Sequence, residues 1–198
     1  MSDETSTSST LLFDTDVSTL NSRETVLLRK LQTSYTPELA REVLVPLIDQ
    51  TSPVSLRALD WAVTNWSKVN NVICSSPIAG EYTNVHQAYV NTLTYWKRKL
   101  FDPFRRRKRI TLRLDDKEYE TTLGQANFAL FAYRTGVLSY VLGHIDLIEA
   151  HMNETNHAQK RKRQESRDSG VRRKRTELTQ SAPLRCVAII APTLVEFS

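Results

Sequence analysis

Residues 110–136 read Ile-Thr-Leu-Arg-Leu-Asp-Asp-Lys-Glu-Tyr-Glu-Thr-Thr-Leu-Gly-Gln-Ala-Asn-Phe-Ala-Leu-Phe-Ala-Tyr-Arg-Thr-Gly. Apolar and polar residues alternate from Ile110 to Leu114, which is typical of a strand with one buried face. The acidic pair that begins at Asp115 predicts a turn, and a second strand returns after it. We therefore expect a short β-hairpin over 108–121.

A helix is predicted immediately after this hairpin. Thr122, followed three positions later by Gln125, forms a capping-box pattern at its start. Phe128 and Phe131 give the helix an apolar face, and Gly136 suits the left-handed residue that often ends a helix.

Helical patterns surround this central stretch, with apolar residues recurring three or four positions apart. Pro46 falls inside one of these patterns and should bend or stop that helix. The stretch 72–80 contains a proline and a glycine and reads as a loop. We expect helices that begin at Ser22, at Thr36-Pro37-Glu38 and at Ser55, and further helices over about 82–100 and 137–154. The predicted fold class is mainly α with a small β element (α+β).

Four regions follow from these patterns. Residues 1–20 are predicted to be a flexible N-terminal tail, although an apolar patch at 11–13 could attach it to the domain or to another subunit. Residues 21–154 form the helical domain with its hairpin. Residues 155–182 lack apolar periodicity and are predicted to be a solvated basic linker. Residues 183–198 are rich in Val and Ile and predict a C-terminal strand that adds to a sheet edge, in the same chain or in another molecule.

Charge is distributed unevenly along the chain. Of the 27 Lys and Arg residues, nine fall in 97–113 and nine in 160–175. We expect a partner to bind at these two regions of the chain.

Cys74 and Cys186 lack a paired spacing, which favours reduced thiols over a disulfide. No apolar run approaches the ~20 residues that a membrane-spanning helix needs.

The first basic cluster has five consecutive cations. Lys97, Arg98 and Lys99, just before it, end a helix, where positive charge is favourable. The five that follow repel one another, and an anionic neighbour would neutralise them. They predict a phosphate-bearing or acidic-protein partner, and the alternative is a solvated face with internal ion pairs. These residues are Arg105, Arg106, Arg107, Lys108 and Arg109.

The second cluster consists of two tetrabasic blocks separated by a polar spacer. This arrangement is typical of a bipartite nuclear-import signal, and it also suits non-specific binding to nucleic acid. The alternative is a solvated linker without a partner. The blocks are Lys160, Arg161, Lys162 and Arg163, then Arg172, Arg173, Lys174 and Arg175.

Catalytic motifs are absent from the sequence. It contains no Gly-rich phosphate loop, no Gly-x-Ser-x-Gly elbow, no His-Glu-x-x-His helix and no paired-cysteine metal motif. His144 and His151 share a helical face without a carboxylate partner, which is a weak metal signal. Aromatic residues near the basic clusters could stack on bases, but Trp61, Trp66 and Trp96 recur at helical spacing and are better explained as core. We expect a protein that is not an enzyme, with no cofactor and no metal.

Several short motifs in the sequence resemble the central region of minor capsid protein eight of large nucleocytoplasmic DNA viruses. They are Trp61…Asn65-Trp66-Ser67-Lys68, Phe101-Asp102-Pro103-Phe104-Arg105-Arg106, Thr121-Thr122-Leu123-Gly124-Gln125-Ala126-Asn127-Phe128, Glu177-Leu178-Thr179-Gln180-Ser181-Ala182 and Val195-Glu196-Phe197. The resemblance covers about 60–198. It implies a virion component beneath the major capsid shell that either holds capsomers together or links the shell to a membrane. We expect the protein to be part of a large assembly in the virion, and to lie in the host cytoplasm or nucleus during assembly.

We therefore expect a minor capsid component that holds other capsid proteins through its basic and terminal segments. The alternative is a nucleic-acid-binding accessory protein of the virion or the nucleus. The absence of a membrane-spanning stretch departs from what direct anchoring in an inner membrane would require.

Overall fold

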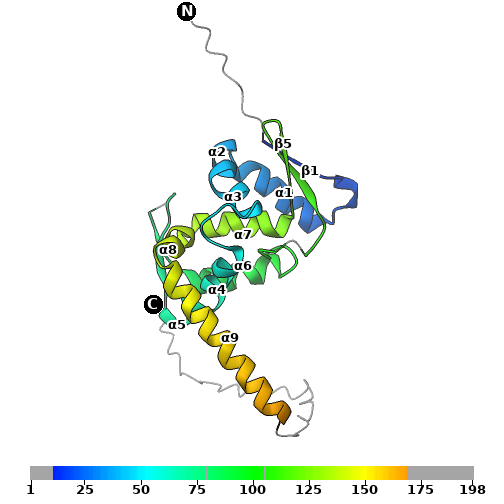
Figure 1. Ribbon diagram of the computed structural model, residues 1–198. Coiled ribbons are helices and arrows are strands. Elements are labelled where there is room, and N and C mark those ends of the chain that lie inside the picture. The colour runs from blue at the N-terminus through cyan, green and yellow to red at the C-terminus, as the bar shows by residue number, and fades with distance from the viewer. Residues whose placement is uncertain (1–10, 79, 105, 169–198) are drawn as a thin grey trace, which may run out of the picture. The chain divides into compact units, whose positions relative to one another are not determined.

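The computed structural model describes residues 11–78, 80–104 and 106–168, and it confirms a mainly helical α+β fold (Figure 1). The chain divides into two units, 1–158 and 159–198. The described helices are α1 (Ser22–Ser34), α2 (Pro37–Leu39), α3 (Val45–Ile48), α4 (Leu56–Trp61), α5 (Ser67–Asn70), α6 (Val85–Trp96), α7 (Leu123–Arg134), α8 (Val137–Gly143) and α9 (Ile145–Asp168).

Two small antiparallel sheets accompany these helices. The predicted hairpin is confirmed as β4 (Ile110–Leu114) and β5 (Lys117–Thr121). The N-terminal strand β1 (Leu11–Asp14) pairs with β4, so the sheet order is β1-β4-β5. The prediction of a flexible tail over 1–20 is therefore wrong for 11–20, where a 3₁₀ turn η1 (Val17–Thr19) follows the strand. The apolar patch at 11–13 attaches this segment to the domain by strand pairing.

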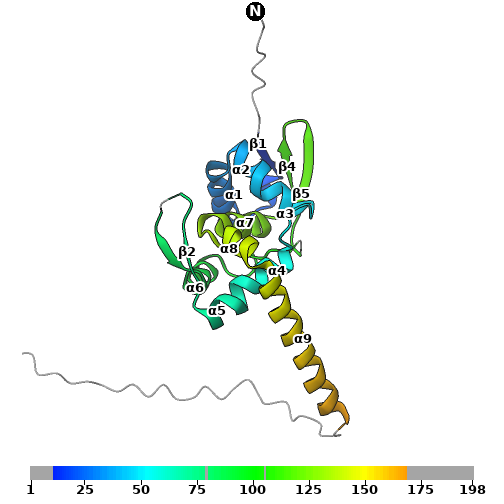
Figure 2. The same ribbon diagram turned by 60° about the vertical axis from the view of Figure 1, so that its left-hand side comes forward.

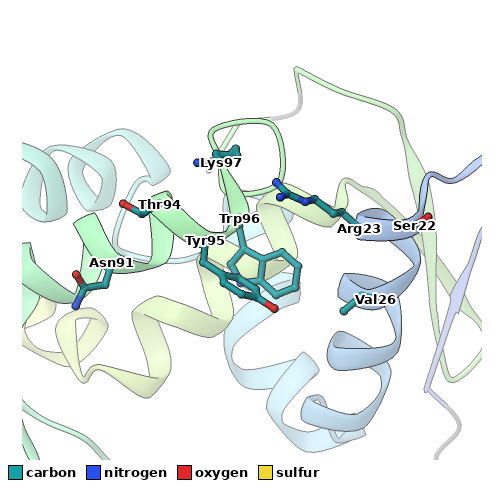
Figure 3. A pocket seen from close by; sticks show the side chains of 8 residues that line it. All are labelled: Ser22, Arg23, Val26, Asn91, Thr94, Tyr95, Trp96 and Lys97. Atoms are coloured by element: carbon teal, nitrogen blue, oxygen red, sulfur yellow. The ribbon is translucent and has the colours of Figure 1, made fainter.

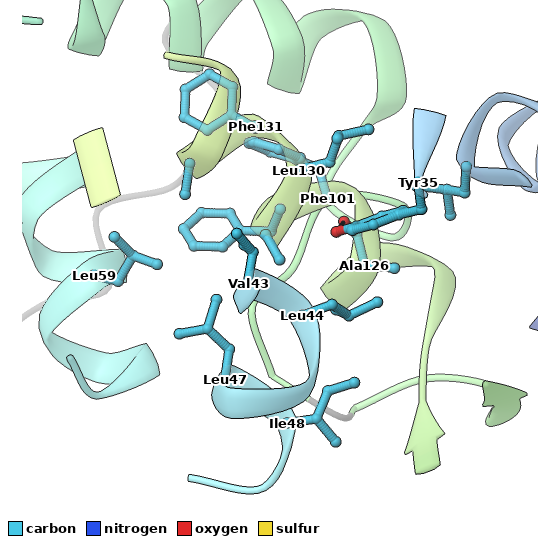
Figure 4. Packing of buried hydrophobic residues seen from close by; sticks show 14 of the residues in the cluster. Tyr35, Val43, Leu44, Leu47, Ile48, Leu59, Phe101, Ala126, Leu130 and Phe131 are labelled. Atoms are coloured by element: carbon cyan, nitrogen blue, oxygen red, sulfur yellow. Dashed lines mark hydrogen bonds between the residues drawn. The ribbon is translucent and has the colours of Figure 1, made fainter. Parts of the chain in front are cut away.

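Helix α7 forms the centre of the core. Every residue from Leu123 to Ala132 is buried, so the helix is covered on all sides rather than on one face. Figure 2 shows α7 between α1, α3 and α8. Figure 4 shows the side chains that pack against it, with Leu44 and Leu47 on one side and Tyr35 on another. The Tyr35 hydroxyl donates to the carbonyl oxygen of Ala126 at 2.9 Å, which satisfies its buried polar atom.

The helix starts follow the capping chemistry expected from the sequence. Side chains of Thr36, Ser55 and Thr122 each accept a backbone N–H in the first turn of the helix that follows. At α1 the cap is Asn21, one residue before the predicted start, and it forms a full capping box with Glu24.

The helix that contains Pro46 ends at Ile48, two residues after the proline, so the predicted stop falls close to it. The π turn η2 (Ala40–Leu44) lies directly before it, and the helical segment continues to the end of α3. In a regular α-helix the proline ring would clash with the carbonyl four residues back, and a wider turn relieves that contact. A second π turn, η3 (Ala62–Trp66), joins α4 to α5.

The predicted loop over 72–80 contains a strand. Strand β2 (Ile73–Ser75) pairs with β3 (Tyr82–Asn84), so the following helix α6 begins at Val85 rather than near 82. Neither strand exceeds three residues, which is too short for the alternation that identifies strands in a sequence. Gly136 ends α7 in the left-handed conformation, as predicted, with φ +74°.

The predicted linker over 155–182 is wrong for its first part, because α9 continues to Asp168. The extension is exposed from Gln159 to Glu165 and contains no apolar periodicity, but its Ala, Gln, Lys, Arg and Glu residues have high intrinsic helix propensity. Apolar periodicity identifies helices that pack, and so it does not reveal a solvated extension. The remainder of the linker and the predicted strand over 183–198 lie outside the described residues.

Candidate functional site

The first basic cluster lies in the loop between α6 and β4, and its start is organised by Asp102. One carboxylate oxygen of Asp102 accepts from the backbone N–H of Phe104 at 3.2 Å. The other lies 3.6 Å from Nε of Arg106, whose guanidinium also sits 4.7 Å from the centre of the Phe104 ring. Arg106 is therefore held by its own chain through an ion pair and a cation–π contact. Arg105 lies outside the described residues.

Two further cations of this cluster also have partners within the chain. Arg109 pairs with Glu120 across the β4–β5 hairpin, with 2.5 Å between the guanidinium nitrogen and a carboxylate oxygen. Lys108 donates to the hydroxyl of Thr19. The alternative of internal ion pairing thus applies to Arg106 and Arg109, and these exposed pairs stabilise the fold only slightly.

Arg107 is different, because it lines a cavity of about 220 Å³ together with Lys99 and Lys108. Neither Arg107 nor Lys99 forms a side-chain ion pair or hydrogen bond with any residue that the structure describes. The cavity also touches the first turn of α7 at Leu123 and Gly124, where the helix dipole adds positive potential. Glu24 also lines the hollow, and its carboxylate accepts from the backbone N–H of Asn21. Three cations and the start of the helix thus face one acid, which leaves the hollow net positive.

Gly124 explains how the α6–β4 loop comes so close to the start of α7. A Cβ atom at this position would stand 3.3 Å from the backbone nitrogen of Asp102 and 3.4 Å from the carbonyl oxygen of Lys99. The side-chain amide of Asn127 fixes the same contact by donating to the carbonyl oxygen of Leu100 at 2.9 Å. Sequence reasoning assigned Lys99 to a helix end, and only this long-range packing places it beside Arg107.

The first block of the second cluster lies on α9. Lys160, Arg161, Lys162 and Arg163 are all exposed. Consecutive helical residues point in directions about 100° apart, so the four charges surround the helix and only Lys160 and Arg163 share a face. The second block, Arg172–Arg175, lies outside the described residues.

The aromatic and histidine candidates have structural roles. Nε1 of Trp61 donates to Nδ1 of His151 at 3.1 Å, and the His151 ring lies edge-on to Trp66. His144 instead contacts the carbonyl oxygen of Tyr140 through Nδ1 and stacks on the Tyr140 ring. Across the described parts of the chain, no group of three or more His, Cys, Asp or Glu side chains could hold a metal ion.

The fold and this site define a mainly helical α+β protein whose basic loop lies against the N-terminus of its central helix. The chain belongs to the DUF7197 family, a family of unknown function, whose model matches residues 7–188. It is also similar to "Uncharacterized protein L507" of Acanthamoeba polyphaga mimivirus, with 34% identity over 136 residues. That match covers 65% of this chain and 52% of the relative, so the chain spans about half the length of the curated protein it matches.

The chain thus belongs to a family of unknown function and is similar to a protein of a large DNA virus. These findings support the viral part of the resemblance seen in the sequence, but they do not confirm minor capsid protein eight. No solved structure matches the chain. Among the helices described, none is both long and apolar enough to cross a membrane.

Proposed function

We propose that the protein is a structural component of the virion that binds an acidic surface on another capsid protein. The observation that carries the proposal is the hollow lined by Lys99 and Arg107 at the start of α7. Both cations lack an ionic partner among the described residues, whereas Arg106 and Arg109 beside them are paired. Grouped positive charges that remain unpaired favour an anion from outside the domain.

The size of this hollow favours binding of protein carboxylates over binding of the phosphate backbone of duplex DNA. A cavity of about 220 Å³ accommodates one or two side-chain carboxylates. Duplex DNA would instead require an extended row of cations matched to successive phosphates. In the described part of the loop, pairing within the chain interrupts such a row at Arg106 and again at Arg109.

The test uses purified virus particles that carry a tagged copy of the full chain. Mass spectrometry of the particles should detect the protein, and the double variant Lys99→Glu/Arg107→Glu should reduce its incorporation by about tenfold. The matched control Arg29→Glu/Lys117→Glu changes the net charge equally at two other exposed positions and should incorporate normally. Absence of the unaltered protein from particles would refute the proposal, as would normal incorporation of the first variant.

A nucleic-acid-binding accessory protein is the second candidate, and the exposed block Lys160–Arg163 favours it. Binding of the full chain to random duplex DNA would be measured over a series of salt concentrations. A log–log slope that corresponds to several phosphates would support this candidate. Absence of binding at moderate salt would count against it.

A further inference from the structure

A larger groove lies between α1 and α6, separate from the basic hollow. Its volume is about 650 Å³, which falls within the range of pockets that bind ligands. Among the residues that line it are Arg23, Val26, Tyr95, Trp96 and Lys97. Figure 3 shows Tyr95 and Trp96 between the two helices, with Val26 facing them from α1.

The floor of the groove is apolar and unusually accessible. Val26 is 52% exposed and Tyr95 is 66% exposed. The two aromatic rings meet edge-on with 4.7 Å between their centres, so the exposed Tyr95 ring is braced by the buried Trp96 ring. A rigid aromatic surface of this kind binds an apolar side chain with little loss of conformational entropy.

The rim of the groove is positive. Arg23 and Lys97 line it, and no acidic residue is among the described residues that do so. Lys30 places its ammonium 5.1 Å from the centre of the Trp96 ring and donates to the side chain of Asn127. Burial, together with repulsion from Arg134, lowers the pKa of Lys30. The apolar floor is therefore framed by cations.

Lys97 also has a backbone conformation that points to function. Its φ is +62° and its ψ is 163°, a region that is essentially restricted to glycine. Glycine would relieve this strain but would remove the cation from the end of the groove. Strain of this kind clusters at binding sites, where the side chain is needed.

We propose that this groove binds a short acidic peptide segment of a partner protein, with one aromatic or large aliphatic side chain against Tyr95 and carboxylates at Arg23 and Lys97. Charge complementarity and the apolar floor specify this occupant. Single-stranded nucleic acid fits less well. The wall opposite the aromatic rings is the aliphatic Val26, and it offers no second aromatic side chain between which a base could stack. The groove is a second binding site, and this proposal does not depend on the basic hollow.

The experiment uses the labelled full chain and an array of peptides about 12 residues long, the length of segment that such grooves bind. Each peptide carries a central Phe, Leu or Ser, with no, few or many flanking acidic residues. We expect binding to require both the apolar centre and the acids. In NMR spectra the tightest peptide should shift resonances of 22–26 and 91–97.

Variants then separate recognition from folding. Tyr95→Ala and Arg23→Glu should each weaken the affinity for the tightest peptide by about tenfold. The matched controls are Tyr82→Ala, an aromatic residue that is 82% exposed elsewhere, and Lys117→Glu, an exposed cation of β5 that does not line the groove. Both controls should leave the affinity within about twofold.

Three outcomes would overturn the proposal. The first is that no array peptide binds more tightly than about 1 mM. The second is that a short oligothymidylate binds the groove more tightly than every peptide. The third is that the groove variants and the controls weaken binding equally.

Discussion

Gly136 provides the sharpest test of the packing between α7, α8 and β2. Its φ is +74°, and a Cβ atom at this position would overlap the carbonyl oxygen of Ser75 and stand 3.1 Å from its carbonyl carbon. An L-residue in the left-handed conformation costs about 1–2 kcal/mol. Forcing a methyl group into packed backbone costs about 1–3 kcal/mol. We therefore expect Gly136→Ala to lower the free energy of unfolding by about 2–5 kcal/mol.

The assay is urea unfolding followed by tryptophan fluorescence, with Gly143→Ala as the matched control. Gly143 is the last residue of α8, and a Cβ atom there would meet nothing within 4 Å. Alanine should raise stability at this position by about 0.5–1 kcal/mol, because glycine in a helix carries an entropic penalty. The same substitution should thus have opposite signs at two positions only seven residues apart. A change of less than about 0.5 kcal/mol for Gly136→Ala would refute the contact with β2.

Three further predictions concern Lys97, Tyr35 and Asp60. Lys97→Gly should raise the free energy of unfolding by about 1 kcal/mol, because glycine relieves the strained backbone. Lys97→Ala should not raise it, and chemical denaturation of the two variants makes the comparison. Tyr35→Phe should cost about 0.5–1.5 kcal/mol, since it removes one buried hydrogen bond while the Ala126 carbonyl keeps its bond within α7. Unchanged stability in the same assay would contradict that hydrogen bond. Burial, and then the carboxylate of Asp102, raises the pKa of Asp60, so its ionised form opposes folding above that pKa. Asp60→Asn should therefore stabilise the protein at neutral pH, and denaturation at several pH values should show the gain disappearing below about pH 4, where Asp60 is neutral in both states.

Local signals in the sequence predicted the hairpin and the helix starts well. The alternation from Ile110 to Leu114 and the hydroxyl of Thr122 each act within a few residues, and both confirmed elements follow directly from them. The pairing of β1 with β4 was missed because it joins segments about a hundred positions apart, and a four-residue strand carries no signal of its partner. The groove was missed for the same reason, since it exists only where α1 meets α6.

The basic loop shows why a count of consecutive charges overstates a binding site. From the sequence, Arg105 to Arg109 form one cationic block that an outside anion should neutralise. In the described part of the loop, the fold instead directs Arg106 and Arg109 to the chain's own acids. It leaves Arg107 beside Lys99, a residue that a helix end alone seemed to explain.

A block of equivalent cations and a pair of cations held in a fixed site recognise a partner in different ways. A block of five equivalent cations would bind any polyanion, with an affinity that depends mainly on salt concentration. Lys99 and Arg107, which lack an ionic partner among the described residues, lie at the N-terminus of the buried helix α7. They form a site of fixed geometry, because Gly124 and Asn127 hold the loop against α7. Fixed geometry favours a specific acidic surface over a general polyanion. If Gly124→Ala displaced the loop without unfolding the domain, partner binding should fall although no cation was removed from the chain.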